Sequence, residues 1–352
     1  MEMIFRNKMK PLLMLGLSGM LLAGCSDWTR PEPVPFDHVT LEEKNPELYQ
    51  AYMESLRDYH ASERKLLVAK YDNTSRRPSG RSEHVNCLPD STDYVILTSV
   101  SSMSDFLQED LADLQTNKGT KVLAQVDVIE LTKKYKLYVD EKAGEEVMPF
   151  SQYISQEMPA WMLAFAQYDY DGVNVVWTGR NPESCTPVML EELKAEQTAF
   201  LSPVLDWLDA HEGKLFFLEG NPQYLLLDRP VAKEADYILV PALSAKTSGE
   251  FTHQVNKVLM EGNVPADRIV LVVTTLSLTD PSLPEGRFSE KNLDGTEMSA
   301  IVGGAHWVNG AYESFLPKGL AVAHAQNDYF DLNKTFSEIR SAISIMNPSP
   351  IK

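Results

Sequence analysis

The sequence predicts an α/β fold, a single (β/α)8 TIM barrel preceded by a lipoprotein signal and a short tether. Three observations predict the barrel: eight short apolar runs recur along the chain, helical patterns separate many of them, and no Gly-rich phosphate-binding loop follows the first run. The last observation argues against the alternative, an open doubly wound sheet. A chain of 352 residues with 43% hydrophobic residues can fill one large domain.

The apolar runs are rich in β-branched residues and bounded by turn signals, so each predicts a strand. Most are continuous rather than alternating, which is typical of parallel strands buried on both faces. The runs span residues 65–71, 93–99, 121–128, 172–178, 214–220, 236–243, 268–275 and 319–326.

Helices are predicted between these strands. The first begins at a Ser104 cap and stops at Gly119, because Ser favours helix starts and Gly favours helix ends. The other predicted helices span residues 151–168, 189–213, 248–263 and 336–346. The long segment 276–318 is left without a predicted element.

The N-terminus has the pattern of a secretory signal. Basic residues precede an apolar run from Pro11 to Ala23, and Cys25 follows in a Leu-Ala-Gly-Cys sequence that resembles a bacterial lipobox. We therefore expect residues 1–24 to be removed and Cys25 to carry acyl chains such as palmitate, which together anchor a protein stably. Residues 25–44 then form a lipid anchor and Pro-rich tether, and residues 45–352 form the barrel.

The anchor and the charge limit where the protein works. Ser26 and Asp27 resemble an acidic surface-sorting signal, so the prediction is an outer membrane lipoprotein on the cell surface, with the periplasmic face as the alternative. The formal net charge of −18 argues against nucleic acid as a partner.

Cys87 and Cys185 are the remaining cysteines, and they belong to no CxxC motif or Cys/His cluster. No metal site and no cofactor is therefore predicted. Cys87 precedes the second strand and Cys185 follows the fourth, so they should lie at opposite ends of the barrel, about 20 Å apart. A disulfide needs Cα atoms within about 7 Å, so none is expected.

The fourth strand lies in the stretch DYDGVNVVWTG, residues 169–179. Together with LPDSTDYVIL, NKGTKVLAQ, GNPQYLLLD, NDYF and IRSAISIMNPS, this stretch resembles glycoside hydrolase family 18, the chitinase and endo-β-N-acetylglucosaminidase family. The resemblance covers most of residues 45–349. It is greatest to a lipoprotein branch of the family in bacterial glycan-utilisation systems.

The resemblance implies a strand-four motif, D-G-x-D-x-D-x-E, in which the Glu protonates the leaving oxygen. The Asp before it steadies the substrate's own N-acetyl nucleophile. Here Asp171 is present, but Asn174, Val176 and Thr178 occupy the later acidic positions. A Thr hydroxyl is far too weak an acid to replace the Glu, and no acid occurs in residues 172–182. The strand-six Tyr of the family is also absent, with Leu243 near its place, so loss of hydrolysis is the prediction.

Two other acids follow predicted strands at the end where barrel enzymes place catalysts, Asp127 and Glu219. They define the alternative, an active endo-β-N-acetylglucosaminidase-type hydrolase with relocated acids. Each also has a structural interpretation: Asp127 as a hydrogen-bonded structural residue, and Glu219 as a loop acid before a turn.

Sugars are bound by aromatic faces and planar polar side chains. Trp177 should instead face the surrounding helices, because Val176 and Thr178 on either side point inward. The mouth is the end of the barrel at which the strands finish. Candidate glycan-binding residues near the predicted mouth are Asn174, Thr178, Asp127, Glu219, Tyr224, Asn327 and Tyr329, with Tyr71, Trp307 and Asp328 as further candidates.

The resulting hypothesis is a surface lipoprotein that binds neutral N-acetylglucosamine-containing glycans without cleaving them. Its expected partners are an outer-membrane importer and partner hydrolases. The relocated-acid hydrolase and a purely structural subunit with a vestigial pocket stay open as alternatives.

Overall fold

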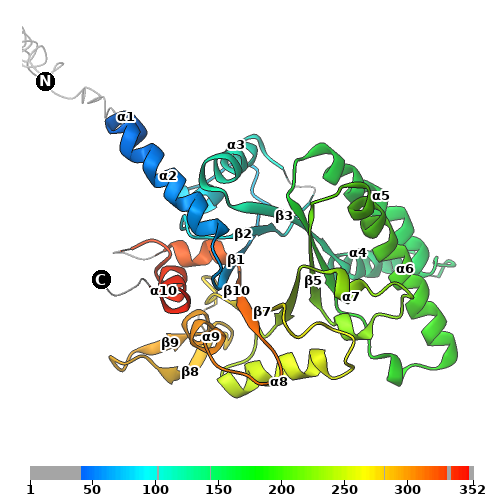
Figure 1. Cartoon of the computed structure of the whole chain (residues 1–352). Coiled ribbons are helices and arrows are strands. Elements are labelled where there is room, and N and C mark those ends of the chain that lie inside the picture. Colours follow the sequence, from blue (N-terminus) through cyan, green and yellow to red (C-terminus); the bar gives the residue numbers. More distant parts are fainter. Residues whose placement is uncertain (1–40, 101–102, 143, 281, 331–333, 349–352) are drawn as a thin grey trace, which may run out of the picture. The chain divides into compact units, whose positions relative to one another are not determined.

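The eight predicted strands form a closed, parallel barrel in the computed structural model, which describes residues 41–100, 103–142, 144–280, 282–330 and 334–348 (Figure 1). Around the barrel the order is β1-β10-β7-β6-β5-β4-β3-β2, so each strand pairs with its neighbour in sequence and the ring closes between β1 and β10. The strands are β1 Leu66–Tyr71, β2 Tyr94–Leu97, β3 Lys121–Asp127, β4 Gly172–Trp177, β5 Leu215–Gly220, β6 Tyr237–Pro241, β7 Ile269–Thr274 and β10 Pro317–Ala323. The predicted barrel and all eight strand positions are confirmed.

Alternate residues of each strand face the barrel lumen, as a pleated backbone requires. Val68, Ile96, Leu123 and Phe217 belong to an apolar cluster inside the barrel. The residues between them along each strand belong to a second, larger core between strands and helices. Hence the strands are apolar on both faces, and their sequences read as continuous runs.

The five predicted helices are also present, and the π-helical turn that continues α3 ends before Gly119, whose φ of 77° suits glycine. Three further helices of eight or more residues were not predicted: α2, α4 and α9. The helices are α2 Pro46–Ala61, α3 Asp105–Asp113, α4 Val128–Glu141, α5 Phe150–Gln167, α6 Pro187–Ala210, α7 Val231–Glu234, α8 Ser248–Leu259, α9 Ala300–Val308 and α10 Ser337–Met346. A π-helical turn continues α3 over Leu114–Lys118, and single 3-10 turns occur at η1 Arg81–Glu83, η2 Val85–Cys87, η4 Pro182–Ser184, η5 Pro222–Tyr224 and η6 Ala325–Tyr329.

The segment 276–318 is more regular than its sequence suggested. It contains an antiparallel hairpin, β8 Arg287–Lys291 and β9 Glu297–Ser299, followed by α9. Helix α9 packs against the hairpin and against α10 (Figure 1). Helix α9 also packs against β7 and β10, and the hairpin lies close to the segment that follows β7.

Contacts divide the chain into two units, residues 1–50 and 51–352. Within the predicted tether of residues 25–44, Leu41–Lys44 form a short helix, α1. The predicted signal segment and Cys25 lie outside the described residues. Among the residues that are described, no helix has the length and apolarity to cross a bilayer.

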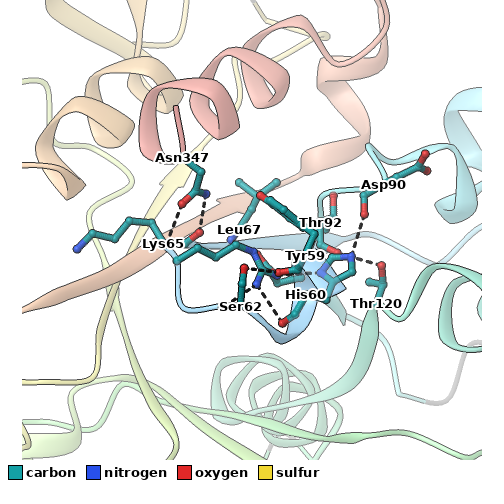
Figure 2. A network of polar contacts seen from close by, with 11 residues as sticks. Tyr59, His60, Ser62, Lys65, Leu67, Asp90, Thr92, Thr120 and Asn347 are labelled. Atoms are coloured by element: carbon teal, nitrogen blue, oxygen red, sulfur yellow. Dashed lines mark hydrogen bonds and ion pairs between the residues drawn. The ribbon is translucent and has the colours of Figure 1, made fainter. Parts of the chain in front are cut away.

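A network of polar contacts lies at the base of the barrel, the end at which the strands begin (Figure 2). The Asp93 carboxylate accepts a hydrogen bond from Leu67 N at 2.8 Å and forms an ion pair with Arg64. Arg64 donates to the His60 carbonyl at 3.0 Å, and the His60 ring contacts the Asp90 carbonyl at 3.0 Å. This network joins the end of α2 to the first two strands.

Candidate functional site

The strand-four motif runs along β4 from the base of the barrel to its mouth. Asp171 precedes β4 at the base, where its carboxylate accepts from Val122 N at 2.9 Å, Gln115 Nε2 at 2.8 Å and Lys121 Nζ at 3.0 Å. These bonds connect β4 to the neighbouring strand and helix. The one acid that the motif retains is therefore structural and lies at the end opposite the mouth.

The next motif positions face the lumen, as predicted. Asn174 is fully buried, and Val176 is paired in register with Asp127 on one side and Glu219 on the other. Trp177 faces outward, where it is buried against the Phe200 ring of α6, with centroids 5.8 Å apart.

Thr178 follows the end of β4 and is exposed to solvent at the mouth. Its hydroxyl thus occupies the motif's general-acid position without an ionisable group. Val176, two residues before it, places a hydrocarbon side chain between two acids.

Glu219, the nearest acid on β5, is held in a buried ion pair. Lys70 Nζ from β1 lies 2.5 Å from Oε1 and 2.6 Å from Oε2, and Asn174 Nδ2 donates to Oε2 at 2.7 Å. Both carboxylate oxygens of Glu219 thus accept hydrogen bonds from protein donors. Only 5% of the residue is exposed, so neither the carboxylate nor Asn174 can reach a sugar in this arrangement.

Gly220 sets the position of Glu219. Its φ of 104° lies in the region that favours glycine, and an added Cβ would lie 2.3 Å from the Trp177 carbonyl oxygen. The next residue, Asn221, donates its N–H to that carbonyl at 2.7 Å. Strands β4 and β5 therefore stay close at the mouth, which keeps Glu219 beside Val176.

The network continues across the lumen through amide side chains. Asn174 Nδ2 also contacts Gln125 Oε1 at 3.3 Å, and Gln125 Nε2 donates to Asp127 Oδ2 at 3.3 Å. The side-chain oxygen of Asn174, Oδ1, is buried without a hydrogen-bond partner. Polar side chains from four strands thus fill the lumen beneath the mouth.

Asp127 combines a structural role with an unusual acidity. Its Oδ1 accepts from Ile129 N at 2.7 Å, so it caps the N-terminus of α4. Burial, with a smaller contribution from the Glu219 carboxylate, raises the pKa of Asp127 to about 6, although the Ile129 N–H and the Lys70 ammonium oppose the change. This carboxyl group can hold a proton in mildly acidic solution and lose it near neutrality.

Three aromatic candidates are buried and are unsuited to stacking on a sugar. Tyr71 lies outside the lumen and donates to the Ser82 carbonyl at 2.7 Å. Trp307 lies within α9, where its Nε1 donates to Thr252 Oγ1 at 3.0 Å. Tyr224 is 9% exposed, and Gln197 of α6 donates to its carbonyl at 2.9 Å. The chain after β5 turns through η5, and Gln197 of α6 also accepts a hydrogen bond from Leu226 N at 2.6 Å, so this turn is held against α6.

The candidates after β10 lie in η6. Asn327 Nδ2 donates to Thr275 Oγ1 at 3.3 Å and lines a cavity, whereas Tyr329 is partly buried against the ring of Phe336. Asp328 accepts from Ile339 N at 2.8 Å and caps α10. Asn327 is therefore separated from the β4 motif, because β10 lies four strands away from β4 in either direction around the barrel.

Sequence reasoning missed Lys70 and Gln125. Both were visible as polar residues at lumen-facing positions: Lys70 is two residues after Val68, and Gln125 lies two residues before Asp127. A lysine at such a position requires a buried partner, which is the signal that leads to Glu219.

Two further sequence expectations concern Leu243 and the cysteines. Leu243 follows β6 and is exposed, so an apolar side chain occupies the region where the family has its Tyr. Cys87 and Cys185 are free thiols. Among the described residues, no group of His, Cys, Asp and Glu side chains has the arrangement needed to hold a metal ion.

Comparison with known proteins decides the family. The family model for glycoside hydrolase family 18, BT1044-like, matches residues 29–345. The chain belongs to glycoside hydrolase family 18. No curated protein sequence matches it significantly.

Two solved structures of similar fold are a selenomethionine variant of BT1044 and an endo-β-N-acetylglucosaminidase from Cordyceps militaris. The first has a TM-score of 0.58 at 17% identity and covers 87% of this chain and 95% of its own. The second has a TM-score of 0.58 at 15% identity and covers 85% of this chain and 96% of its own. At these identities the similarity shows a shared fold. This family 18 barrel accordingly keeps the family's frame, while β4 lacks the motif's later acids.

Proposed function

We propose that this family 18 barrel binds neutral, N-acetylglucosamine-containing glycans at its mouth and does not hydrolyse them. The main support is the end of β4, where Val176 and Thr178 replace the acetamide-stabilising Asp and the general acid. Substrate-assisted hydrolysis requires both groups, one to orient the N-acetyl nucleophile and one to protonate the leaving oxygen. The name of the similar Cordyceps enzyme, an endo-β-N-acetylglucosaminidase, supports the choice of glycan.

The nearby acid Glu219 does not restore this chemistry. Glu219 accepts hydrogen bonds on both oxygens from Lys70 and Asn174 and is buried. The buried polar side chains fill the lumen and form the floor of the mouth. Thr178 is exposed and Asp127 is partly exposed, so these two residues can contact a glycan. A neutral sugar suits this floor because the buried charge of Glu219 is already compensated by Lys70.

A glycan-binding assay with a plug at the mouth tests the proposal. Calorimetry of the detergent-solubilised full chain against N-glycans, mucin O-glycans and chitooligosaccharides should find a ligand. Thr178→Trp should remove that binding, because the exposed side chain would fill the mouth. Thr198→Trp is the matched control, since Thr198 is exposed on α6. Binding that survives Thr178→Trp would place the site elsewhere.

The second candidate function is hydrolysis through Asp127. It is favoured by one observation: the pKa of Asp127 is raised to about 6 by burial, within the range that a general acid needs. Turnover of a chitobiose-core substrate that Asp127→Asn abolishes would establish it. The N-cap bond to Ile129 N can also be kept by Asn, so this variant separates acidity from the structural role.

We further propose that the protein works as an outer membrane lipoprotein on the cell surface and passes glycans to an importer and partner hydrolases. The Leu-Ala-Gly-Cys sequence supports lipidation at Cys25. Cys25→Ser should release the protein from the membrane fraction or leave an unprocessed precursor. Unchanged partitioning of this variant into detergent would contradict the anchor.

A further inference from the structure

A separate cavity of about 270 Å³ lies beside the barrel mouth. Residues from the segment after β7, the β8–β9 hairpin, η6 and the start of α10 line it. Both β7 and β10 end at the mouth, and β10 stands four strands from β4 in either direction, so the cavity is on the opposite side of the barrel from the degenerate motif. It is therefore a site distinct from the lumen.

The backbone around the cavity is preorganised. Gly286 has a φ of 79°, and a Cβ there would lie 2.5 Å from the Thr275 carbonyl oxygen, so glycine allows the hairpin to approach the end of β7. Thr275 Oγ1 in turn contacts the His324 carbonyl at 3.2 Å and Asn327 Nδ2 at 3.3 Å. Hydrogen bonds thus join the segment after β7 to the segment after β10, and both segments line the cavity.

The charged side chains of the cavity have partners. Arg287 Nη1 lies 3.0 Å from Glu297 Oε2, and Ser299 Oγ donates to Glu338 Oε2 at 2.5 Å. Asp328 accepts from the first N–H groups of α10, including Ile339 N at 2.8 Å. A charged ligand would have to compete with these bonds, whereas a neutral ligand would leave them intact.

The lining also contains apolar side chains and one amide. Phe330 is 65% exposed, and Leu276 and Leu278 are exposed as well. The amide of Asn327 donates through Nδ2, which leaves its carbonyl oxygen to accept from a ligand. Phe330 and Asn327 line the same cavity, and an exposed aromatic ring together with a planar amide suits a pyranose ring, which has an apolar face and a hydroxylated edge.

The size of the cavity limits the ligand. Pockets for drug-sized molecules have volumes of about 300–1,000 Å³, so a cavity of about 270 Å³ suits one sugar ring rather than an extended chain. We propose that this cavity binds a single neutral pyranose residue, such as a terminal sugar of the glycan whose core occupies the mouth. The assignment rests on the proposed glycan-binding function and adds a second subsite to it.

Monosaccharide titrations of the detergent-solubilised full chain test the subsite directly. Met298 lines the cavity, so its methyl resonance in a ¹³C-methyl-methionine-labelled sample is a local probe, assigned through Met298→Leu. At least one of galactose, mannose, fucose, glucose, N-acetylglucosamine and N-acetylgalactosamine should shift this resonance saturably, and sialic acid should not. An unmoved resonance across the neutral sugars, or a shift with sialic acid alone, would overturn the assignment.

Variants then connect the cavity to the whole glycan. Phe330→Ala and Asn327→Ala should each weaken the saturable monosaccharide shift and the calorimetric affinity for the branched glycan by about 5-fold or more, through lost stacking or a lost hydrogen bond. Leu283→Ala is the control, because Leu283 is an exposed apolar residue between β7 and β8 that does not line the cavity. It should bind like the wild type.

The outcomes separate this subsite from the proposed function. If the wild type binds no glycan in the panel, the proposed function fails and the subsite fails with it. If Thr178→Trp removes glycan binding while Phe330→Ala and Asn327→Ala bind like the wild type, the mouth is the site and only the second subsite is wrong.

Discussion

At the base of the barrel, Asp93 and Arg64 bond to main-chain groups as well as to each other, whereas at the mouth Lys70 and Glu219 bond only to side chains. The base network therefore fixes where β1 begins and where α2 ends. Among the described members of the lumen network beneath the mouth (Lys70, Gln125, Asp127, Asn174 and Glu219), the Asp127 side chain is the one that bonds to a main-chain group. The difference explains how the acids of the β4 motif can be absent from an intact barrel: side chains at the mouth can change without moving a strand.

The largest expected effect is a loss of stability when the network at the base of the barrel is broken. Asp93→Ala should lower the free energy of unfolding by about 3–5 kcal/mol, because Arg64 would lose its buried partner and Leu67 N its acceptor. Urea unfolding followed by circular dichroism measures the change. Asp209→Ala, which breaks an exposed pair with Arg229, is the control and should lower the free energy of unfolding far less, because exposed ion pairs contribute little to stability. Equal losses in the two variants would contradict a structural role for the base network.

A double-variant cycle makes the complementary test at the mouth. Lys70→Met should cost about 3 kcal/mol, because it leaves the Glu219 carboxylate buried without its counter-charge. Lys70→Met combined with Glu219→Gln should recover much of this loss, since both charges are gone and an acceptor remains for Asn174. If the double variant is less stable than either single variant, the mouth pair supports the fold as the base pair does.

The acidity of Asp127 provides a finer test of the same lumen. Its ¹³C carboxyl resonance should titrate near pH 6, because burial raises its pKa to about that value. Lys70→Met should raise the pKa further and Glu219→Gln should lower it, as removal of a nearby positive or negative charge requires. A midpoint near 4 in the wild type would show that solvent reaches the carboxyl group freely.

The smallest expected effect is a difference in the pH dependence of stability. Burial lowers the pKa of His60, which lies near Arg64, Asp93 and Asp90. Unfolded His60 therefore takes up a proton at a higher pH than folded His60, and stability falls as the pH drops below about 6.5. The raised pKa of Asp127 acts in the opposite direction between about pH 6 and 4. His60→Gln should flatten the loss between pH 7 and 5.5 in urea unfolding, and an unchanged slope would exclude His60 as its cause.

The barrel was predictable because parallel strands buried on both faces leave uninterrupted apolar runs, as in β7, Ile269–Thr274. Helix α4 was missed although Asp127 and Glu130 have the spacing of a capping box, because it begins at Val128 directly after β3 and no Gly or Pro separates the two elements. The hairpin in segment 276–318 was missed because its strands are short and mostly exposed.

The site was less predictable than the fold. Motif spacing placed Val176 and Thr178 correctly, because the side-chain direction alternates along a strand. Tyr224 was placed at the mouth because it follows β5, but chain direction after a strand depends on tertiary packing, here against α6. The Lys70–Glu219 pair joins residues far apart in sequence, so only closure of the barrel brings them together.

The most direct test of the account measures binding and cleavage in one sample. The full chain is incubated with the glycan that calorimetry identifies, and mass spectrometry of the recovered glycan reports any cut at the chitobiose core. The account predicts saturable binding that Thr178→Trp removes and a glycan recovered intact. Cleaved glycan from the wild type but not from Asp127→Asn would contradict it and show that the barrel is a hydrolase with a relocated acid.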